Sequence, residues 1–453
     1  MRSKRFKKPD HELCKSAVLK CFEHKWRRKD ILLFIEEYAG IDRKLVIEET
    51  LKDEDWTIRQ EVADSLGLML QGVIEDLVEN GTEPDGIEQV KIRTRPDGMT
   101  GKKRDIALLC ILHQLLGHAE KLMIEPLIYA RLHPTQHASI PGRGQTKLKD
   151  QAHRYLLRES LGINCIQKTD VVHAYATLMY SVIIEILEKE IPKAKDAIEL
   201  MRYLGSIAPG GHLIIGGYLD AWLFNFAMSY AITDLYTLTQ TRRGKTSRRV
   251  IRVESYMDDF AIMTASNKNM TIGVNRLKKF CNENLGVDIR TTTGVMKLLP
   301  VEEEKRRKEL PRPAQRGVPM LDMAGYRISR THVTIRRRVF RKARRVYMRA
   351  WEEYERTGTL TRQRAQAVTS YYGYFKQSDS RKARKKYRVD ELMRIAKRVS
   401  RHYSILDNKR RKEQINDLQR YRVEHPAPEG PHRDSSGRNQ GSQTGRQYRG
   451  THR

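Results

Sequence analysis

The stretch SYMDDFAIM, Ser255 to Met263, sets two adjacent aspartates, Asp258 and Asp259, among apolar residues. Its flanks are β-branched and apolar, so residues 248–265 are predicted to form a β-hairpin with the acids at the turn. Aspartate is depleted in strands, and neighbouring carboxylates repel each other unless a cation lies beside them. A solvated turn is the simpler interpretation of two aspartates. The apolar flanks favour a site for Mg²⁺, which prefers carboxylate oxygens.

Asp170 is the candidate for a third carboxylate. A two-metal site holds ions about 3.5–4 Å apart, and here it needs a carboxylate from a second strand to bridge them. Asp170 lies near the end of CIQKTDV, residues 165–171, which is predicted to be a buried strand. If that strand and the hairpin are neighbours in one sheet, Asp170 and Asp258 meet. The alternative for Asp170 is a cap at the end of its strand.

The charge balance points to a polyanionic partner. The chain has 453 residues with 86 Lys and Arg against 56 Asp and Glu, a formal net charge of +30. Such an excess is typical of proteins that lie against a phosphate backbone. A membrane surface would be the competing partner, but the sequence has no basic amphipathic helix with a bulky apolar face. The longest apolar-leaning stretch, residues 207–232, contains Pro, His, Asp and several Gly, so it is predicted to be core.

The cysteines and the N-terminus favour a cytoplasmic protein. Five cysteines are scattered without a C-x-x-C pair, which argues against a zinc site or a disulfide framework. The first ten residues, MRSKRFKKPD, lack the apolar core of a signal peptide.

The pattern along the chain changes three times. Residues 1–87 have helical periodicity, with Gly81 as a helix stop, and residues 88–335 mix strands with helices. From Arg336 to Arg349 eight of fourteen residues are basic and none is acidic, and helical patterning continues to about residue 400. The predicted divisions are 1–87, 88–335, 336–405 and 406–453. The last is basic and rich in Pro, Gly, Ser and Gln, so it is predicted to be largely disordered.

Two motifs resemble those of reverse transcriptases: YMDD, residues 256–259, is similar to the metal-binding motif, and DVVHAY, residues 170–175, to the first palm motif. Further segments follow in the order of that family over about residues 88–390. They are VKIRTRPDGMTGKKRDIAL, HASIPGRGQTK, APGGHL, DMAGYRISRTH and AVTSYYGYFKQSDSRKARKKY. The chain thus resembles the bacterial reverse transcriptases of retrons, group II introns, diversity-generating elements and defence systems. The resemblance implies an α+β right-hand polymerase, with fingers and an antiparallel palm at 88–335 and a helical thumb at 336–405.

The resemblance assigns the catalytic residues. Asp170 and Asp258 would hold two Mg²⁺ ions, or Mn²⁺ in their place, with Val171 also at the metal site. Asp259 would be the weaker carboxylate of the catalytic set. The ions would activate the primer 3′-hydroxyl and neutralise the triphosphate.

The nucleotide-binding residues are assigned in the same way. Tyr175 falls on the sugar-gate position, where a ring would collide with a 2′-hydroxyl, although a core tyrosine is the alternative. Lys103 and Arg104 would bind the triphosphate, whereas Lys102 is read as a solvated charge. Gly211 of the template-positioning motif would also contact the nucleotide. Outside this set, Gly142 and Gly144 would form a turn that lets backbone approach a phosphate.

The primer and template would lie along a second group of residues. Tyr256 and Met257 would touch the primer end, and Gly325 and Tyr326 belong to the segment that resembles the primer grip. The basic thumb surface would follow the duplex backbone, with Tyr347 and Trp351 beside it. The expected contacts of this surface are Arg336, Arg337, Arg341 and Arg345.

Four departures from the family pattern stand out. Gly210 lies between Pro209 and Gly211, where a polar residue is usual, and Gly216 and Gly217 occupy a region where serine is usual. The lysine expected after the GVDI segment is displaced, with Thr293 near its place and Lys297 the nearest substitute. MAGY stands where FLGY is common.

The function expected from the resemblance is RNA-directed DNA polymerisation from dNTPs, on an RNA template and with a DNA product. A dedicated non-coding RNA and a role in antiviral defence are the expected context, because the sequence shows a palm without a nuclease or integration motif. A template-independent or protein-primed DNA polymerase is one alternative. An RNA-binding, maturase-like splicing cofactor is another. Homo- and hetero-oligomers both stay open.

Overall fold

The computed structural model describes residues 5–52, 56–85, 87, 89–96, 103–310 and 317–424. The N-terminal region is helical, as its periodicity predicts. Its helices are α1 (His11–Phe22), α2 (Lys29–Ala39), α3 (Arg43–Lys52) and α4 (Thr57–Asn80). The Asp10 side chain accepts a hydrogen bond from the Leu13 amide at 2.9 Å and so caps α1. α4 ends at Gly81, whose φ of 65° is the left-handed conformation that glycine adopts readily.

A hairpin and two helices follow. β1 (Lys91–Pro96) and β2 (Lys103–Leu108) pair antiparallel, as expected, while residues 97–102, with most of the P-D-G turn and Lys102, lie outside the described residues. α5 (Ile111–Arg131) is buried over most of its length, and residues 132–144 connect it to α6 (Gln145–Leu157).

The central sheet carries the candidate site. Its strand order is β6-β7-β3-β8, with β9 also pairing with β3, and every pairing is antiparallel. Its strands are β3 (Cys165–Val171), β6 (Val250–Tyr256), β7 (Asp259–Thr264), β8 (Ile289–Thr291) and β9 (Met296–Lys297). The predicted strand at residues 286–289 therefore begins later, at Ile289.

Both faces of the central sheet are covered, which explains the unbroken apolar run in β7. Phe260 and Ile262 pack into the large core with α10 (Tyr218–Thr237) and α11 (Asn267–Leu285). Ala261 and Met263 point into a second core with α6 and the small sheet β10–β12. Successive side chains of a strand point to opposite faces, so a strand buried on both sides is apolar throughout.

Shorter elements surround the sheet. They are η1 (Glu159–Leu161), α7 (Ala174–Thr177), α8 (Tyr180–Glu190), α9 (Lys195–Ile207), η2 (Pro209–Gly211), β4 (Thr239–Arg242), β5 (Lys245–Arg248) and α12 (Val301–Glu309). The stretch predicted to be core supplies most of the buried helix α10. No helix among the described residues is long and apolar enough to cross a membrane.

The C-terminal part begins with the small antiparallel sheet and continues as helices. The elements are β10 (Leu321–Met323), β11 (Tyr326–Ile328), β12 (Val333–Ile335), α14 (Arg337–Thr357), α15 (Arg362–Lys376), α16 (Arg381–Lys386) and α17 (Val389–Glu424). The helices have a core of their own, and the side of α14 away from it is rich in exposed arginines.

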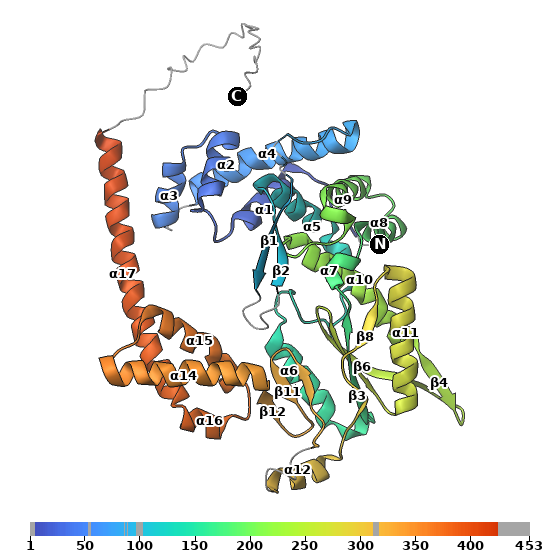
Figure 1. Cartoon of the computed structure of the whole chain (residues 1–453). Coiled ribbons are helices and arrows are strands. Elements are labelled where there is room, and N and C mark those ends of the chain that lie inside the picture. The colour runs from blue at the N-terminus through green and yellow to red at the C-terminus, as the bar shows by residue number, and fades with distance from the viewer. Residues whose placement is uncertain are drawn as a thin grey trace.

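α17 departs from the sequence-based expectation. It continues to Glu424, so residues 406–424 are helical rather than disordered, and residues 425–453 lie outside the described part. Arg362 of α15 pairs with Asp407 of α17 at 2.7 Å. Further along, Arg411 donates to the backbone carbonyls of Thr50 and Leu51 at the end of α3. Figure 1 shows α17 reaching back from the C-terminal helices to the N-terminal region. These tertiary contacts explain a helix that the polar composition did not predict.

Candidate active site

Three carboxylates converge at one end of the central sheet. Asp170, in β3, lies directly opposite Asp259, the first residue of β7. Tyr256 pairs with Asp259, so Met257 and Asp258 form a two-residue turn, and the predicted hairpin is confirmed. The Val171 amide donates to the Asp258 carbonyl at 3.0 Å. β3 and β7 are thus adjacent, and the turn is tied to the strand that bears Asp170.

The turn has an unusual backbone. Met257 has φ of 52°, a left-handed conformation that is uncommon for residues other than glycine. Its Sδ lies 3.8 Å from the Asn225 side-chain nitrogen, and that same nitrogen donates to the Ala138 carbonyl at 3.1 Å. Met257 therefore packs under the turn, in contact with α10.

The carboxylates stand in a strongly negative environment. Burial, followed by the charges of Asp259 and Asp170, raises the pKa of Asp258 to about 6. Burial also raises the pKa of Asp259, although Lys168 partly offsets it. Ionisation of these carboxyl groups is unfavourable in this environment, and an added cation would stabilise the ionised form.

Two basic side chains compensate part of this charge. Lys168 Nζ lies 2.6 Å from Asp259 Oδ1, and Arg290 Nε donates to Asp170 Oδ2 at 2.9 Å. Consistent with these pairs, no group of three metal-ligating side chains is already gathered around one point in the described part of the chain. The donor set of three acidic side chains suits a hard divalent cation, provided that Lys168 and Arg290 give way.

Sequence inspection missed both cations. Lys168 lies two residues before Asp170, hence on the same face of β3, so strand periodicity could have revealed it. Arg290 faces Asp170 through the pairing of β8 with β3, which no local pattern signals. Lys297 pairs with Cys165, five residues from Asp170 along β3 and so about 16 Å away. Thr293 instead stabilises the sheet, because its Oγ1 accepts a hydrogen bond from the Lys168 amide of β3 at 3.0 Å.

Tyr175 lies close to the carboxylates. Its ring stacks on Phe224, with centroids 5.5 Å apart. Burial raises the pKa of its hydroxyl; the charges of Asp220 and Asp258 add to the shift, and Arg104 opposes it. The Tyr175 hydroxyl therefore lies within electrostatic range of both the carboxylates of the sheet and the β1–β2 hairpin.

The β1–β2 hairpin presents Lys103 and Arg104 from exposed positions on β2. Its register sets Arg104 opposite Arg95. The Ala107 amide donates to the Ile215 carbonyl at 2.8 Å, which attaches β2 to the segment after η2.

That attachment accounts for Gly216, and the nearby Asp220 carboxylate accounts for Gly217. A Cβ on Gly216 would lie 2.7 Å from the Ala107 carbonyl oxygen, and its φ of 116° is rarely open to other residues. A Cβ on Gly217 would lie 1.7 Å from the Asp220 carboxylate. Gly210 and Gly211 both have φ of 68°, so the PGG turn needs two consecutive left-handed residues.

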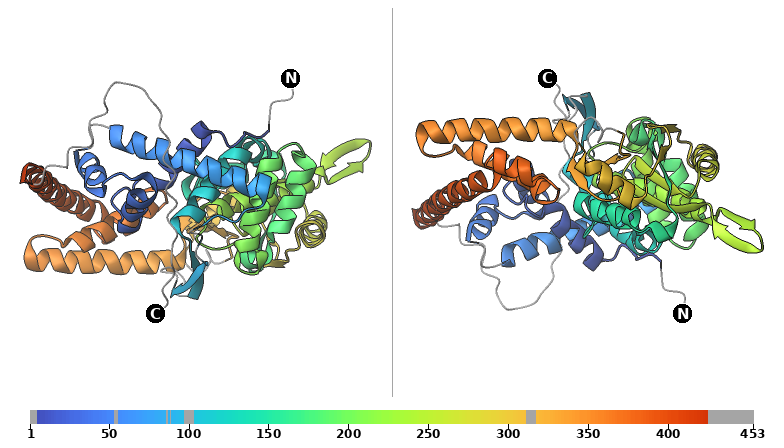
Figure 2. Two further views of the ribbon diagram at one scale, coloured as in Figure 1. Left: turned by 90° about the horizontal axis from the view of Figure 1, so that it is seen from above. Right: turned by 90° about the horizontal axis from the view of Figure 1, so that it is seen from below.

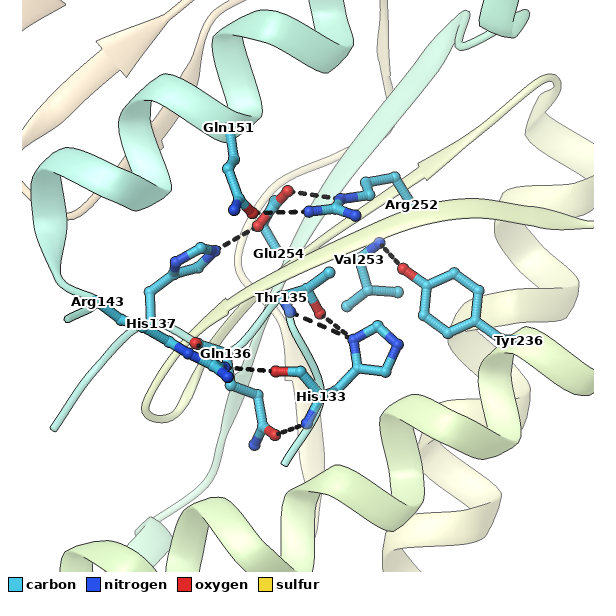
Figure 3. A network of polar contacts seen from close by, with 10 residues as sticks. All are labelled: His133, Thr135, Gln136, His137, Arg143, Gln151, Tyr236, Arg252, Val253 and Glu254. Atoms are coloured by element: carbon cyan, nitrogen blue, oxygen red, sulfur yellow. Dashed lines mark hydrogen bonds and ion pairs between the residues drawn. The ribbon is translucent and has the colours of Figure 1, made fainter. Parts of the chain in front are cut away.

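A buried polar network supports β6 just before the YMDD turn (Figure 3). Thr135 and His137 pair with the backbone of Ser255: its amide donates to the Thr135 carbonyl at 2.9 Å, and its carbonyl accepts from the His137 amide at 3.1 Å. The His137 Nε2 lies 2.6 Å from Glu254 Oε2, and both side chains are fully buried. Arg252 Nε donates to Glu254 Oε1 at 2.6 Å.

The same network holds the connecting segment 132–144. Arg143 donates to the His133 and Gln136 carbonyls at 2.7 and 2.9 Å. Gly142 and Gly144, with φ of 69° and 136°, flank it and form the turn that leads into α6, as predicted. Burial, followed by the charges of Arg252, Arg143 and Arg248, lowers the pKa of His133 to about 4. No local sequence pattern predicts this network, because its partners lie far apart in the chain.

The residues of the predicted primer grip are partly structural. Gly325, with φ of 85°, lies under the Tyr374 ring, and Tyr326 is buried in the core with α6. Tyr256 is half-buried beside the turn. Arg336 pairs with Asp322, and its positive charge weakly opposes the rise in the pKa of Asp259, so it lies on the side of the carboxylates.

The basic surface of α14 is present, with one correction. Arg337, Arg341 and Arg345 are exposed, and Trp351 is covered by the guanidinium of Arg388 at 3.9 Å. Tyr347 was expected at this surface but is fully buried, where its hydroxyl donates to the Val368 carbonyl at 2.9 Å. Its position on the apolar side of α14, four residues after Ala343, explains this.

No family model matches the sequence, and no curated protein matches it. Several solved structures are distantly similar. Apo telomerase from Candida tropicalis has 9% identity over 85% of this chain and 81% of its own, with a TM-score of 0.38. Telomerase from Candida albicans, solved with the TWJ fragment of telomeric RNA, has 11% identity over 73% and 66%, with a TM-score of 0.36. The Sicinivirus 3Dpol RNA-dependent RNA polymerase has 15% identity over 51% of this chain and 50% of its own, with a TM-score of 0.31.

The elements of the chain itself form a mixed α+β fold, mostly helical with antiparallel sheets. The match covers about half of the viral polymerase. At this level the similarity concerns fold alone.

Proposed function

We propose that this chain is an RNA-directed DNA polymerase that extends a primer from dNTPs by metal-dependent nucleotidyl transfer. The observation that carries the proposal is the register of β3 against β7, which brings Asp170, Asp258 and Asp259 to one end of the sheet. The raised pKa of Asp258 supports it, because it reflects burial of the carboxyl group and then the negative charges of Asp259 and Asp170, both of which a bound cation would offset. Residues 88–335 would form fingers and palm, and residues 336–405 the thumb.

The carboxylates would act as metal ligands. Asp170 and Asp258 would hold two Mg²⁺ ions, with Asp259 as the weaker carboxylate and Val171 beside them. Bound ions would supply Lewis-acid activation of the primer 3′-hydroxyl and charge neutralisation at the triphosphate. Lys168 and Arg290 would hold the carboxylates in place in the metal-free protein and release them when cations bind.

The incoming nucleotide would lie between the β1–β2 hairpin and Tyr175. Lys103 and Arg104 supply positive charge suited to a triphosphate, and Arg can contact it in a bidentate manner. The Tyr175 ring, held against Phe224, would exclude a 2′-hydroxyl and so favour deoxynucleotides. The backbone of Gly211 would line the nucleotide on the same side as Tyr175.

Primer and template would follow the carboxylates toward α14. Tyr256 and Met257 lie at the turn itself, and Arg336 immediately precedes α14. The exposed Arg337, Arg341 and Arg345 would contact phosphates and set affinity rather than sequence preference.

The proposal is tested by primer extension on a primed RNA template with Mg²⁺ and labelled dNTPs. An Asp258→Ala/Asp259→Ala variant and a lane without template run beside the unchanged protein. We expect template-dependent product that disappears in the variant. Equal product from both proteins would overturn the assignment of the carboxylates. If neither makes product, even after co-purified cellular RNA is added back, the RNA-binding cofactor becomes the better explanation.

The lane without template addresses a second polymerase mode. The PGG turn has no polar side chain at Gly210, where the family usually has one, and this favours altered handling of the template. Homopolymer or simple-repeat product in that lane would support template-independent synthesis. A product linked to protein would support protein priming.

We further propose that the template is a dedicated non-coding RNA and that the enzyme acts in antiviral defence. The observation behind this is in the sequence: motifs that resemble a reverse transcriptase palm occur without a Cys/His nuclease motif after them. Cells with and without the gene and its flanking RNA are challenged with a broad phage panel. Fewer plaques with the intact pair are expected, and equal counts across the panel would count against the role.

A further inference from the structure

The β4–β5 hairpin stands apart from the rest of the fold. Its strands pair only with each other, and residues 241–248 are all exposed. Figure 1 and both views of Figure 2 show it projecting at the end of the molecule opposite α14 and α17. An isolated two-stranded hairpin is at best marginally stable in water. Its persistence at an exposed end therefore calls for an explanation.

The base of the hairpin is firmly attached. The Arg249 amide donates to the Leu238 carbonyl at 2.8 Å, and the guanidinium donates to the Thr239 carbonyl at 3.0 Å. The same guanidinium reaches Asn269 Oδ1 of α11 at 3.1 Å. The Arg248 guanidinium lies 5.5 Å from the Tyr236 ring centroid. These two arginines thus have structural partners, and the hairpin is held at a defined angle.

The tip is different. We name Arg242, Arg243 and Lys245 the hairpin tip. Their side chains are exposed and form no ion pair with any described residue. Arg242 lies directly opposite Lys245 in the register, and like charges in that arrangement destabilise a hairpin.

The turn residues add to this conflict. Arg243 and Gly244 have φ of 51° and 72°, as in a type I′ turn, where Asn-Gly is the preferred pair. An arginine in that left-handed position is unfavourable for the turn. Two features of the tip, the like-charge pair and the left-handed arginine, thus oppose local stability, and such conflicts are typical of functional sites.

The chemistry of the hairpin selects its partner. From Thr239 to Arg249 five of eleven residues are basic, none is acidic and none is apolar. A protein partner would require an apolar centre in the interface, whereas interfaces with nucleic acid are polar and strongly positive. We propose that the hairpin tip binds the phosphate backbone of a folded RNA, at a distance from the duplex that would lie along α14. The choice of RNA over DNA rests on the function proposed above.

The test variant is Arg242→Thr/Arg243→Asn/Lys245→Thr. It removes the three cations, while threonine suits strands and Asn-Gly suits the turn, so the hairpin is expected to be at least as stable. Binding of a fluorescent 20-base-pair RNA duplex is measured by anisotropy over a range of KCl concentrations, without dNTPs or Mg²⁺. We expect the slope of log K against log salt to become shallower by about 2 to 3, since each phosphate contact contributes about 0.9.

A matched control removes the same charge nearby. Lys268→Gln/Lys278→Gln/Lys279→Gln changes three exposed lysines of α11. If the tip variant and this control variant bind RNA equally, the proposal is overturned. A loss confined to a DNA duplex of the same sequence would overturn the choice of RNA.

A further variant separates the two surfaces. Arg337→Gln/Arg341→Gln/Arg345→Gln removes three of the exposed cations of α14, and adding the tip substitutions should weaken the binding that remains. No further loss on adding them would count against an independent site. Because no nucleotide is incorporated, these results do not depend on polymerase activity. If the unchanged protein makes no primer-extension product but the tip variant binds RNA more weakly than the control variant, the proposed function is refuted and this inference stands.

Discussion

Replacing Glu254 by glutamine tests how the YMDD hairpin is held. The Glu254 side chain is 0% exposed, and it accepts from His137 Nε2 and Arg252 Nε, each at 2.6 Å. It precedes Tyr256 by two residues on the same strand. Glu254→Gln keeps the shape of the side chain but removes its charge and leaves Arg252 without a counter-ion.

The expected cost follows from this geometry. With an effective dielectric constant of about 20, unit charges 2.6 Å apart attract by about 6 kcal/mol before desolvation is subtracted. Removing one member of a buried pair typically costs about 3–5 kcal/mol. The glutamine oxygen still accepts one hydrogen bond, so we expect a loss of about 3 kcal/mol in the free energy of unfolding. With a urea dependence of about 3 kcal/mol per M, the unfolding midpoint falls by about 1 M.

The assay is urea unfolding followed by tryptophan fluorescence, since Trp222 is buried in α10 within the large core. Asp390→Asn is the matched control. Asp390 also accepts from an arginine, Arg384, and from the Tyr372 hydroxyl, but its side chain is 48% exposed. An exposed pair contributes about 0–1 kcal/mol, so its midpoint should hardly move.

Primer extension by the same proteins links the network to the site. We expect the turnover number of Glu254→Gln to fall while the KM for dNTP stays near that of the unchanged protein, because the strand bearing the turn shifts and the β1–β2 hairpin does not. A midpoint shift no larger than that of Asp390→Asn would refute the reasoning. Unchanged turnover together with a large midpoint shift would show that the network serves stability alone.

Three further predictions concern other parts of the chain. Gly216→Ala should raise the KM for dNTP several-fold in steady-state extension, since the new Cβ would push against the Ala107 carbonyl and displace β2; Gly294→Ala, which meets nothing within 4 Å, should not. Lys168→Gln should lower the melting temperature without Mg²⁺, because Asp259 loses its 2.6 Å partner. Added Mg²⁺ should then raise the melting temperature of the variant more than that of the unchanged protein, and equal increases would contradict the role of the lysine. Burial alone would raise the pKa of Glu304, but hydrogen bonds from His332, Ser329 and Thr331 outweigh it and lower that pKa from 4.5 to about 2. The carboxylate therefore stabilises the fold fully above about pH 4.5 and loses this contribution as the pH falls through about 2, so acid unfolding of Glu304→Gln should begin from a lower stability but depend less on pH in that range.

Local chemistry determined much of what could be predicted. Asp258 and Asp259 flanked by apolar strands, the helical periodicity up to Gly81 and the unbroken basic run from Arg336 are all visible in short windows of sequence. Each follows from short-range physics: alternation along a strand, spacing along a helix, or repulsion between adjacent charges. The hairpin at YMDD followed from these patterns, whereas the α+β class was expected from the resemblance to reverse transcriptases.

Tertiary structure decided which distant side chains contact the residues of these patterns. Arg290 meets Asp170 from 120 residues away, and His137 meets Glu254 from 117 residues away. Neither partner is distinguishable by type from other arginines and histidines in the chain. Tyr347 turned inward because α14 packs its apolar face on α15, and residues 406–424 became helical because α17 contacts α3. Burial and charge compensation depend on which segments meet, and only the folded chain brings them together.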